Sequence, residues 1–194
     1  MESEKEFFMR FPTFLELHNT TELLGQPVTL SGANRTGDKR IDYVFDFLDT
    51  AIKVGKKFGL SPIIILGQGS VESGWGTSQL ARENHNFFGV TAYGKPNAFW
   101  DGSFRVSKSS GLKFRNYKSV EDGFSDYASM ITRYYPDAAK VSNDITAYAT
   151  KIANSPYINE KNGDNRAKYR ALIIQSATTI LEIAKKKYLQ LQNR

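Results

Sequence analysis

Residues 63 to 73 form a run that is apolar on nearly every face of a helix, and this run constrains the fold most. Ser61 and Pro62 precede it in the order typical of a helix start, with the serine as N-cap and the proline at the first helical position. A helix without a polar face needs neighbours on all sides. We therefore expect this helix at the centre of the core.

Glu72 lies at the end of this run and is the only charged residue between Lys57 and Arg82. Partial burial disfavours the charged form of a carboxylate and so raises its pKa. Donation of a proton to a glycosidic oxygen requires an acid that is still protonated near neutral pH. The same position would suit a carboxylate that bonds backbone amides of the Ser73-Gly74 turn, and the spacing alone does not separate these two interpretations.

The flanking sequence predicts helices on both sides of a small β-lobe. The apolar periodicity and the turn residues assign a helix to 38–58, a β-lobe to 74–117 with a hairpin of 103–106 and 112–117, and helices starting at 119, 143 and 165. This order predicts a mainly helical α+β fold of two lobes with a groove between them.

Residues 1–37 are expected to form an N-terminal arm that packs on a domain of residues 38–194, because prolines and glycines interrupt any long element there. The acidic N-terminus contains no visible signal peptide. No segment approaches the ~20 apolar residues of a membrane span.

Composition directs the chemistry toward carboxylates and tyrosines. The chain has no cysteine and only two histidines, so we expect neither a thiolate nucleophile nor a metal site, and no cofactor. The net charge of +6 suits an anionic partner. Aromatic residues of the β-lobe could stack sugars or nucleic-acid bases, or could build the core of the lobe. No nucleic-acid motif is present, so we do not expect nucleic acid as a partner.

Three motifs carry a resemblance to a known family. Glu72-Ser73-Gly74-Trp75-Gly76 is followed by Asn84-His85-Asn86-Phe87-Phe88-Gly89-Val90, and later by Ala153-Asn154-Ser155-Pro156-Tyr157. Together they resemble the glucosaminidase family, family seventy-three of the glycoside hydrolases, over roughly residues 40–188. This family includes cell-wall autolysins and the hydrolase domain of the flagellar rod-cap protein.

The resemblance implies a lysozyme-like fold and a role for individual residues. Glu72 matches the general acid of the family, and Tyr157 matches a tyrosine that lines the cleavage point. The residues expected to bind substrate are Trp75, Asn86, Phe88, Gly89 and Tyr127; for Trp75 and Phe88, core packing is an equal alternative.

One part of the chain departs from the family pattern. Many members carry a second acidic residue in the hairpin of the β-lobe, where this chain reads Arg105-Val106-Ser107-Lys108-Ser109-Ser110-Gly111. Asp101 is the nearest preceding acid and is a candidate for the base that activates water. A base from elsewhere, or the N-acetyl group of the substrate, would serve as well.

The resemblance implies a monomeric hydrolase that cleaves β-1,4 bonds of peptidoglycan glycan strands in the periplasm or at the cell wall, as an N-acetylglucosaminidase. The alternatives are a muramidase or lytic transglycosylase of the same fold, or a non-catalytic module that binds the wall.

Overall fold

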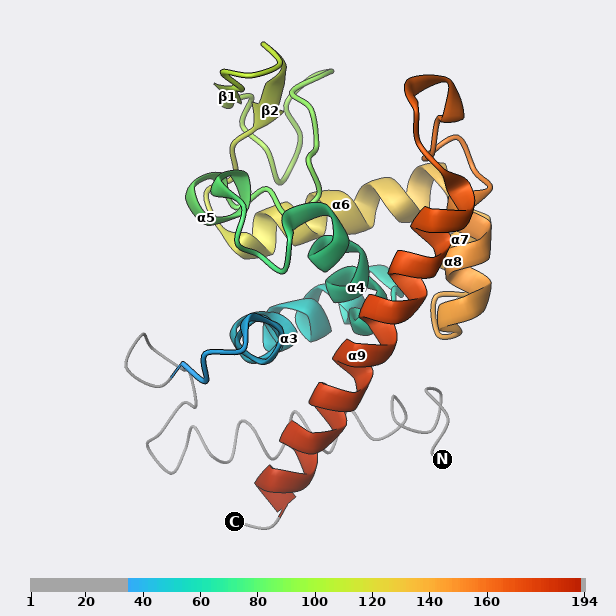
Figure 1. Cartoon of the computed structure of the whole chain (residues 1–194). Coiled ribbons are helices and arrows are strands. Elements are labelled where there is room, and N and C mark those ends of the chain that lie inside the picture. Colours follow the sequence, from blue (N-terminus) through green and yellow to red (C-terminus); the bar gives the residue numbers. More distant parts are fainter. Residues whose placement is uncertain (1–34, 193–194) are drawn as a thin grey trace.

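The computed structural model describes residues 35–192, so most of the expected N-terminal arm lies outside the described residues (Figure 1). In chain order the elements are α3 (Lys39–Phe58), α4 (Pro62–Ser73), α5 (Gln79–Asn84), β1 (Phe104–Val106), β2 (Lys113–Arg115), α6 (Val120–Tyr134), α7 (Pro136–Ala139), α8 (Ile145–Ala153), the 3-10 turn η2 (Glu160–Asn162) and α9 (Arg166–Gln192). The prediction of a mainly helical α+β fold with a small β-lobe is confirmed.

Helix α4 is the central helix that its apolar sequence predicts. Ile63, Ile64, Ile65 and Leu66 are fully buried. Helices α3 and α9 pack on α4, while α6 packs on α3 and α8 packs on α9. The four isoleucine and leucine side chains thus have helices around them instead of water, which is the arrangement that a helix without a polar face requires.

Helix α9 approaches α4 closely at Gly67. A Cβ atom added to Gly67 would lie 3.0 Å from the Cβ of Ala177 on α9, so a larger residue would push the two helices slightly apart. Ala177, which faces Gly67, is fully buried, whereas Leu172 of the same helix is 37% exposed. The close crossing holds the first turns of α9 beside the end of α4.

The β-lobe is smaller than the sequence suggests. Strands β1 and β2 pair antiparallel over three residues each, with Phe104 opposite Arg115 and Val106 opposite Lys113. Helix α5 occupies part of the segment that we expected to be β, and the Ser78 side chain caps it by accepting from the amide of Ala81. The sequence prediction was wrong for this segment because a six-residue helix is too short to display a period.

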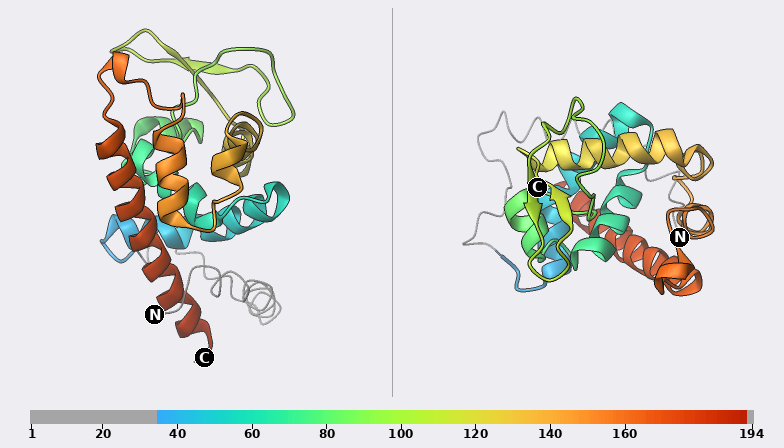
Figure 2. Two further views of the ribbon diagram at one scale, coloured as in Figure 1. Left: turned by 90° about the vertical axis from the view of Figure 1, so that its right-hand side faces the viewer. Right: turned by 90° about the horizontal axis from the view of Figure 1, so that it is seen from above.

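The β-lobe and the connection between α8 and α9 lie at the same end of the molecule, on opposite sides of α4 in Figure 1, and the side view in Figure 2 agrees. Helix α6 runs beneath the β-lobe (Figure 2). None of the helices within residues 35–192 has both the length and the apolar character that crossing a membrane requires.

Asp126 of α6 fastens the β-lobe to the helical body. Its carboxylate accepts hydrogen bonds from Arg115 at 2.7 Å, from the Tyr117 hydroxyl at 2.6 Å and from the Asn97 amide at 2.8 Å. Arg115 also donates to the carbonyl of Tyr93 at 2.8 Å. Asp126 is 2% exposed, so one buried carboxylate holds both the hairpin and the loop before it against α6.

Candidate active site

The turn that ends α4 fixes the position of Glu72. Gly74 ends the helix in the left-handed conformation (φ 60°), a conformation that glycine adopts without a steric penalty. The Ser73 hydroxyl donates to the carbonyl of Gly69 at 2.5 Å and accepts from the amide of Gly76 at 2.8 Å. The serine and glycines of the motif therefore form the turn that presents the glutamate at the end of the buried helix.

Glu72 is the end of a chain of hydrogen bonds that begins inside the protein. The Tyr169 hydroxyl of α9 donates to Oε1 of Glu72 at 2.7 Å, and the Gln68 amide donates to the Tyr169 hydroxyl at 3.1 Å. Gln68 lies four residues before Glu72, on the same face of α4. The carboxylate is thus oriented by α4 and α9 together.

Gln68 is in turn held by two buried tyrosines. Its Oε1 accepts from Tyr127 at 2.5 Å and from Tyr148 at 2.7 Å, and all three residues are fully buried. Helices α6 and α8 supply these tyrosines. Four helices therefore contribute to one polar network that ends at Glu72, and such a network fixes geometry because each member has a partner.

The environment of Glu72 favours its protonated form. The side chain reaches solvent, but the surrounding protein desolvates the carboxylate, and this raises its pKa. The hydrogen bond from Tyr169 opposes the increase, while the negative charge of Asp164 adds to it. A raised pKa together with an open face is the combination that a proton donor needs.

Tyr157 lies beside this carboxylate. Burial raises its pKa, and the negative charge of Glu72 raises it further, so its hydroxyl stays neutral and can donate a hydrogen bond. Its ring packs edge-on against Tyr135 (centroids 5.6 Å apart) and lies 6.1 Å from the ring of Tyr169. The Arg166 guanidinium donates to the carbonyl of Ser155 at 2.8 Å and so stabilises the loop that carries Tyr157.

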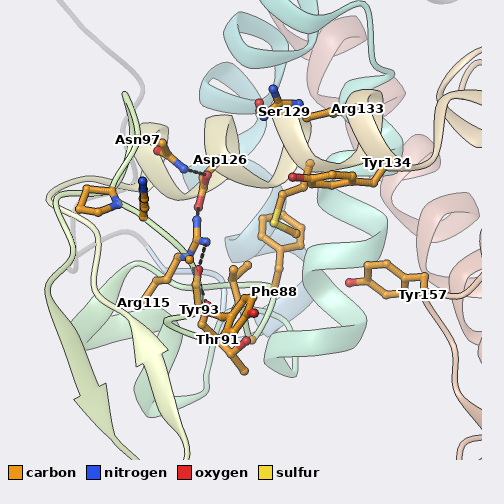
Figure 3. Close-up of a pocket in the computed structure, with 16 residues that line it drawn as sticks. Phe88, Thr91, Tyr93, Asn97, Arg115, Asp126, Ser129, Arg133, Tyr134 and Tyr157 are labelled. Atoms are coloured by element: carbon orange, nitrogen blue, oxygen red, sulfur yellow. Dashed lines mark hydrogen bonds and ion pairs between the residues drawn. The ribbon is translucent and has the colours of Figure 1, made fainter.

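A cavity of about 760 Å³ begins at Tyr157 and runs along α6 toward the β-lobe (Figure 3). Phe88, Gly89, Tyr93, Arg133 and Tyr134 are among the residues that line it. Glu72 is not among the lining residues, but Tyr157 both lines the cavity and is close enough to Glu72 for the carboxylate charge to raise its pKa. Tyr157 therefore relates the cavity to the carboxylate.

Two of the residues expected to bind substrate have supporting roles. Tyr127 is fully buried, with its hydroxyl in the Gln68 network and its ring stacked on Phe88 at 3.7 Å. Asn86 is 2% exposed, and its amide donates to the carbonyls of Val90 and Arg115, at 2.9 Å each. The polar atoms of both residues are thus bonded within the protein, and their contact with substrate stays a prediction.

Phe88 and Gly89 line the cavity, whereas Trp75 packs elsewhere. Trp75 is half-buried in a left-handed backbone conformation (φ 64°), with its ring edge-on to Tyr43 at 5.8 Å. A non-glycine residue in this conformation is strained and needs surrounding contacts to hold it. The aromatic packing on Tyr43 provides such contacts.

Asp101 is held as a turn residue. Its Oδ1 accepts from the amide of Ser103 at 2.9 Å, and its carboxylate pairs with Lys118 at 3.3 Å. Hydrogen bonds from Ser103 lower its pKa to about 2, with a smaller contribution from Lys118. These contacts are those of an aspartate that closes a turn.

Sequence reasoning did not identify Tyr169, Gln68 and Asp164 as parts of the site. The hydrogen bond from the Tyr169 hydroxyl to Glu72 depends on the crossing of α9 and α4, which the sequence does not display. A glutamine at i−4 from the glutamate, inside an apolar helix, was the one available signal. Among residues 35–192 no cluster of three metal-binding side chains occurs.

The mainly helical fold with a small β-lobe, and a glutamate at the end of its central helix, indicate a class: the lysozyme-like glycoside hydrolases. Residues 48–186 match the family described as "Glucosaminidase: Mannosyl-glycoprotein endo-beta-N-acetylglucosaminidase". The chain belongs to this glucosaminidase family.

Relatives and solved structures agree with this assignment. The chain is 30% identical over 174 residues to "Peptidoglycan hydrolase FlgJ" of Salmonella typhimurium, covering 81% of this chain and 52% of that protein. It is 28% identical to "Probable N-acetylmuramidase" of Lactococcus lactis, covering 80% of this chain and 33% of that protein. The glycoside hydrolase domain of Salmonella typhimurium FlgJ superposes with a TM-score of 0.56 at 29% identity, covering 80% of this chain and 99% of that domain. The chain thus spans about half or less of the full relatives and nearly all of the hydrolase domain.

The contacts of Glu72 predict opposite pH effects for two substitutions. Activity that needs protonated Glu72 falls as pH rises through its pKa. Tyr169→Phe removes a bond that stabilises the charged form, so the pKa rises and the alkaline limb of the pH–rate profile moves to higher pH. Asp164→Asn removes a negative charge, so the limb moves to lower pH. Profiles of kcat/KM for both variants test this, and shifts of the same sign would contradict it.

Proposed function

We propose that the chain is a peptidoglycan hydrolase of N-acetylglucosaminidase type, which cleaves β-1,4 bonds of wall glycan in the periplasm or at the cell wall. The observation that carries the proposal is Glu72, an accessible carboxylate with a raised pKa that Tyr169 orients beside a long cavity. Membership of the glucosaminidase family supports the same reaction. The name of the FlgJ relative supports peptidoglycan as the substrate.

In this mechanism Glu72 donates its proton to the glycosidic oxygen as the bond to the anomeric carbon breaks. The sugar then carries positive charge, and the carboxylate left on Glu72 stabilises it. Tyr157 stays neutral and can donate a hydrogen bond to the sugar at the cleavage point. Tyr169 accepts no proton in this step; it orients the carboxylate. Water then adds to the anomeric carbon and loses one proton, and uptake of a proton by the Glu72 carboxylate restores the acid and completes the hydrolysis.

The substrate can be tested with purified sacculi. We expect the protein to release soluble muropeptides from sacculi, and to do so in proportion to enzyme and time. Release would be followed by chromatography of the supernatant, with heat-denatured protein as the control. Sacculi that stay intact under conditions where the chain is folded would contradict the proposal.

A muramidase is the second candidate, because one relative carries that name. Both enzymes would use a protonated glutamate and would differ only in which of the two alternating bonds lies at Glu72. The identity of the new reducing end distinguishes them.

Asp101→Asn is expected to reduce turnover only slightly, because Ser103 and Lys118 hold this carboxylate in a turn. Loss of a general base costs about 10²–10⁴-fold in rate. We expect the turnover of Asp101→Asn to fall by about tenfold at most, which is below the lower limit of this range. A loss of 10²-fold or more, with an unchanged circular dichroism spectrum, would identify Asp101 as the water-activating base.

A further inference from the structure

The cavity next to Tyr157 carries positive charge that the chemistry at Glu72 does not use. Four charged side chains line it: Lys95, Arg115, Asp126 and Arg133. Arg115 and Asp126 neutralise each other through a buried ion pair of 2.7 Å. No acidic side chain within residues 35–192 forms an ion pair with Lys95 or Arg133. Two exposed cations therefore face the cavity without a counter-charge from the described chain.

Two exposed tyrosines accompany these cations. Tyr93 is 86% exposed and Tyr134 is 65% exposed, although large aromatic side chains usually bury most of their surface. Both line the cavity, from opposite walls: Tyr93 from the loop of the β-lobe and Tyr134 from the end of α6 (Figure 3). Exposed aromatic rings on the two walls of a cavity suit a ligand with flat apolar faces as well as polar groups.

Arg133 lies near one of these tyrosines. Its guanidinium lies 5.9 Å from the centre of the Tyr134 ring. A guanidinium that rests near a ring keeps its N–H groups available, and a carboxylate is the partner that matches their fork. The ligand of this cavity should therefore carry a carboxylate.

Neutral sugars alone do not supply such a group. In peptidoglycan every second sugar is a muramyl residue whose peptide substituent carries free carboxylates. We propose that this cavity is a subsite for that peptide, with Arg133 and Lys95 binding its carboxylates and the two tyrosines flanking it. The inference rests on the proposed function, and it makes the enzyme selective for peptide-bearing glycan over unsubstituted glycan.

The test compares two glycan probes on the full chain. One is uncross-linked glycan strands that retain their peptides. The other is the same strands after an amidase has removed the peptides, so that each muramic acid keeps only its lactyl carboxylate and the comparison reports the peptide itself. Binding is measured in the Glu72→Gln background, which prevents turnover, and cleavage is measured with Glu72 present. We expect about tenfold tighter binding of the peptide-bearing strands, the lower end of what charge-assisted hydrogen bonds give. The preference should decrease as salt is raised.

The double variant Lys95→Gln/Arg133→Gln should reduce this preference to below about threefold. The matched control Lys39→Gln/Lys56→Gln removes the same charge from exposed positions on α3, and it should keep the preference for peptide-bearing strands. The subsite would be overturned if the parent protein bound both probes with equal affinity. It would also be overturned if the double variant lost affinity for both probes by the same factor. A binding preference without any cleavage by the chain with Glu72 would instead refute the proposed function and leave the subsite standing.

Discussion

Glu72→Gln is expected to lower the rate of glycan hydrolysis by about 10²–10⁴-fold, the usual cost of losing a positioned acid. Glutamine has nearly the same shape and can still accept the hydrogen bond from Tyr169, but it cannot donate a proton as an acid. The Gln68 network and the Gly74 turn stay intact, so we expect the melting temperature to change little.

The rate would be measured on purified sacculi beside Glu182→Gln, which makes the same chemical change at an exposed position on α9. The control should keep the activity of the parent. Hydrolysis by Glu72→Gln within about threefold of the parent would remove Glu72 from the mechanism, since a general acid contributes at least ~10²-fold.

Asp126→Ala is expected to lower the free energy of unfolding by about 3–5 kcal/mol, the typical cost of breaking a buried ion pair by removing one partner. Arg115, whose side chain is 11% exposed, would lose its counter-charge, and the hydroxyl of Tyr117 would lose its acceptor. The β-lobe should detach from α6 before the helical core unfolds, because Asp126 joins the two.

Urea denaturation measures the total effect, and hydrogen exchange locates it in the lobe. Adding Arg115→Met to Asp126→Ala should restore part of the stability, because the uncompensated buried charge is gone. A loss below about 1 kcal/mol for Asp126→Ala, or equal exchange in the lobe and the core, would contradict this role.

Much of the helical fold could be predicted from local signals. The caps at Ser61 and Ser119 and the stops at Gly59 and Gly74 act within one turn of chain, so the end of α3, both ends of α4 and the start of α6 follow directly from the sequence. Strands β1 and β2 lie within the predicted hairpin of 103–106 and 112–117. Helix α5 could not be read in this way, because its six residues are fewer than two helical periods.

The features of the candidate site also differ in whether local sequence predicts them. The isolated position of Glu72 in an apolar helix predicts a raised pKa, and the structure confirms its direction. The bond from Tyr169 and the charge of Asp164 come from α9 and the loop before it, so they depend on the tertiary fold. Tyr127 shows a further difficulty: a motif identifies residues that a site needs, but not whether they touch the ligand or support those that do.

The identity of the new reducing end tests the central claim most directly. Muropeptides released from sacculi would be reduced with borohydride and analysed by mass spectrometry, with Glu72→Gln as the inactive reference. The proposed glucosaminidase leaves N-acetylglucosamine at the new reducing end, so the reduced fragments should end in its alditol. Fragments that end in reduced muramic acid would instead identify a muramidase, and an anhydro sugar would identify a transglycosylase; either result would contradict the proposed bond specificity.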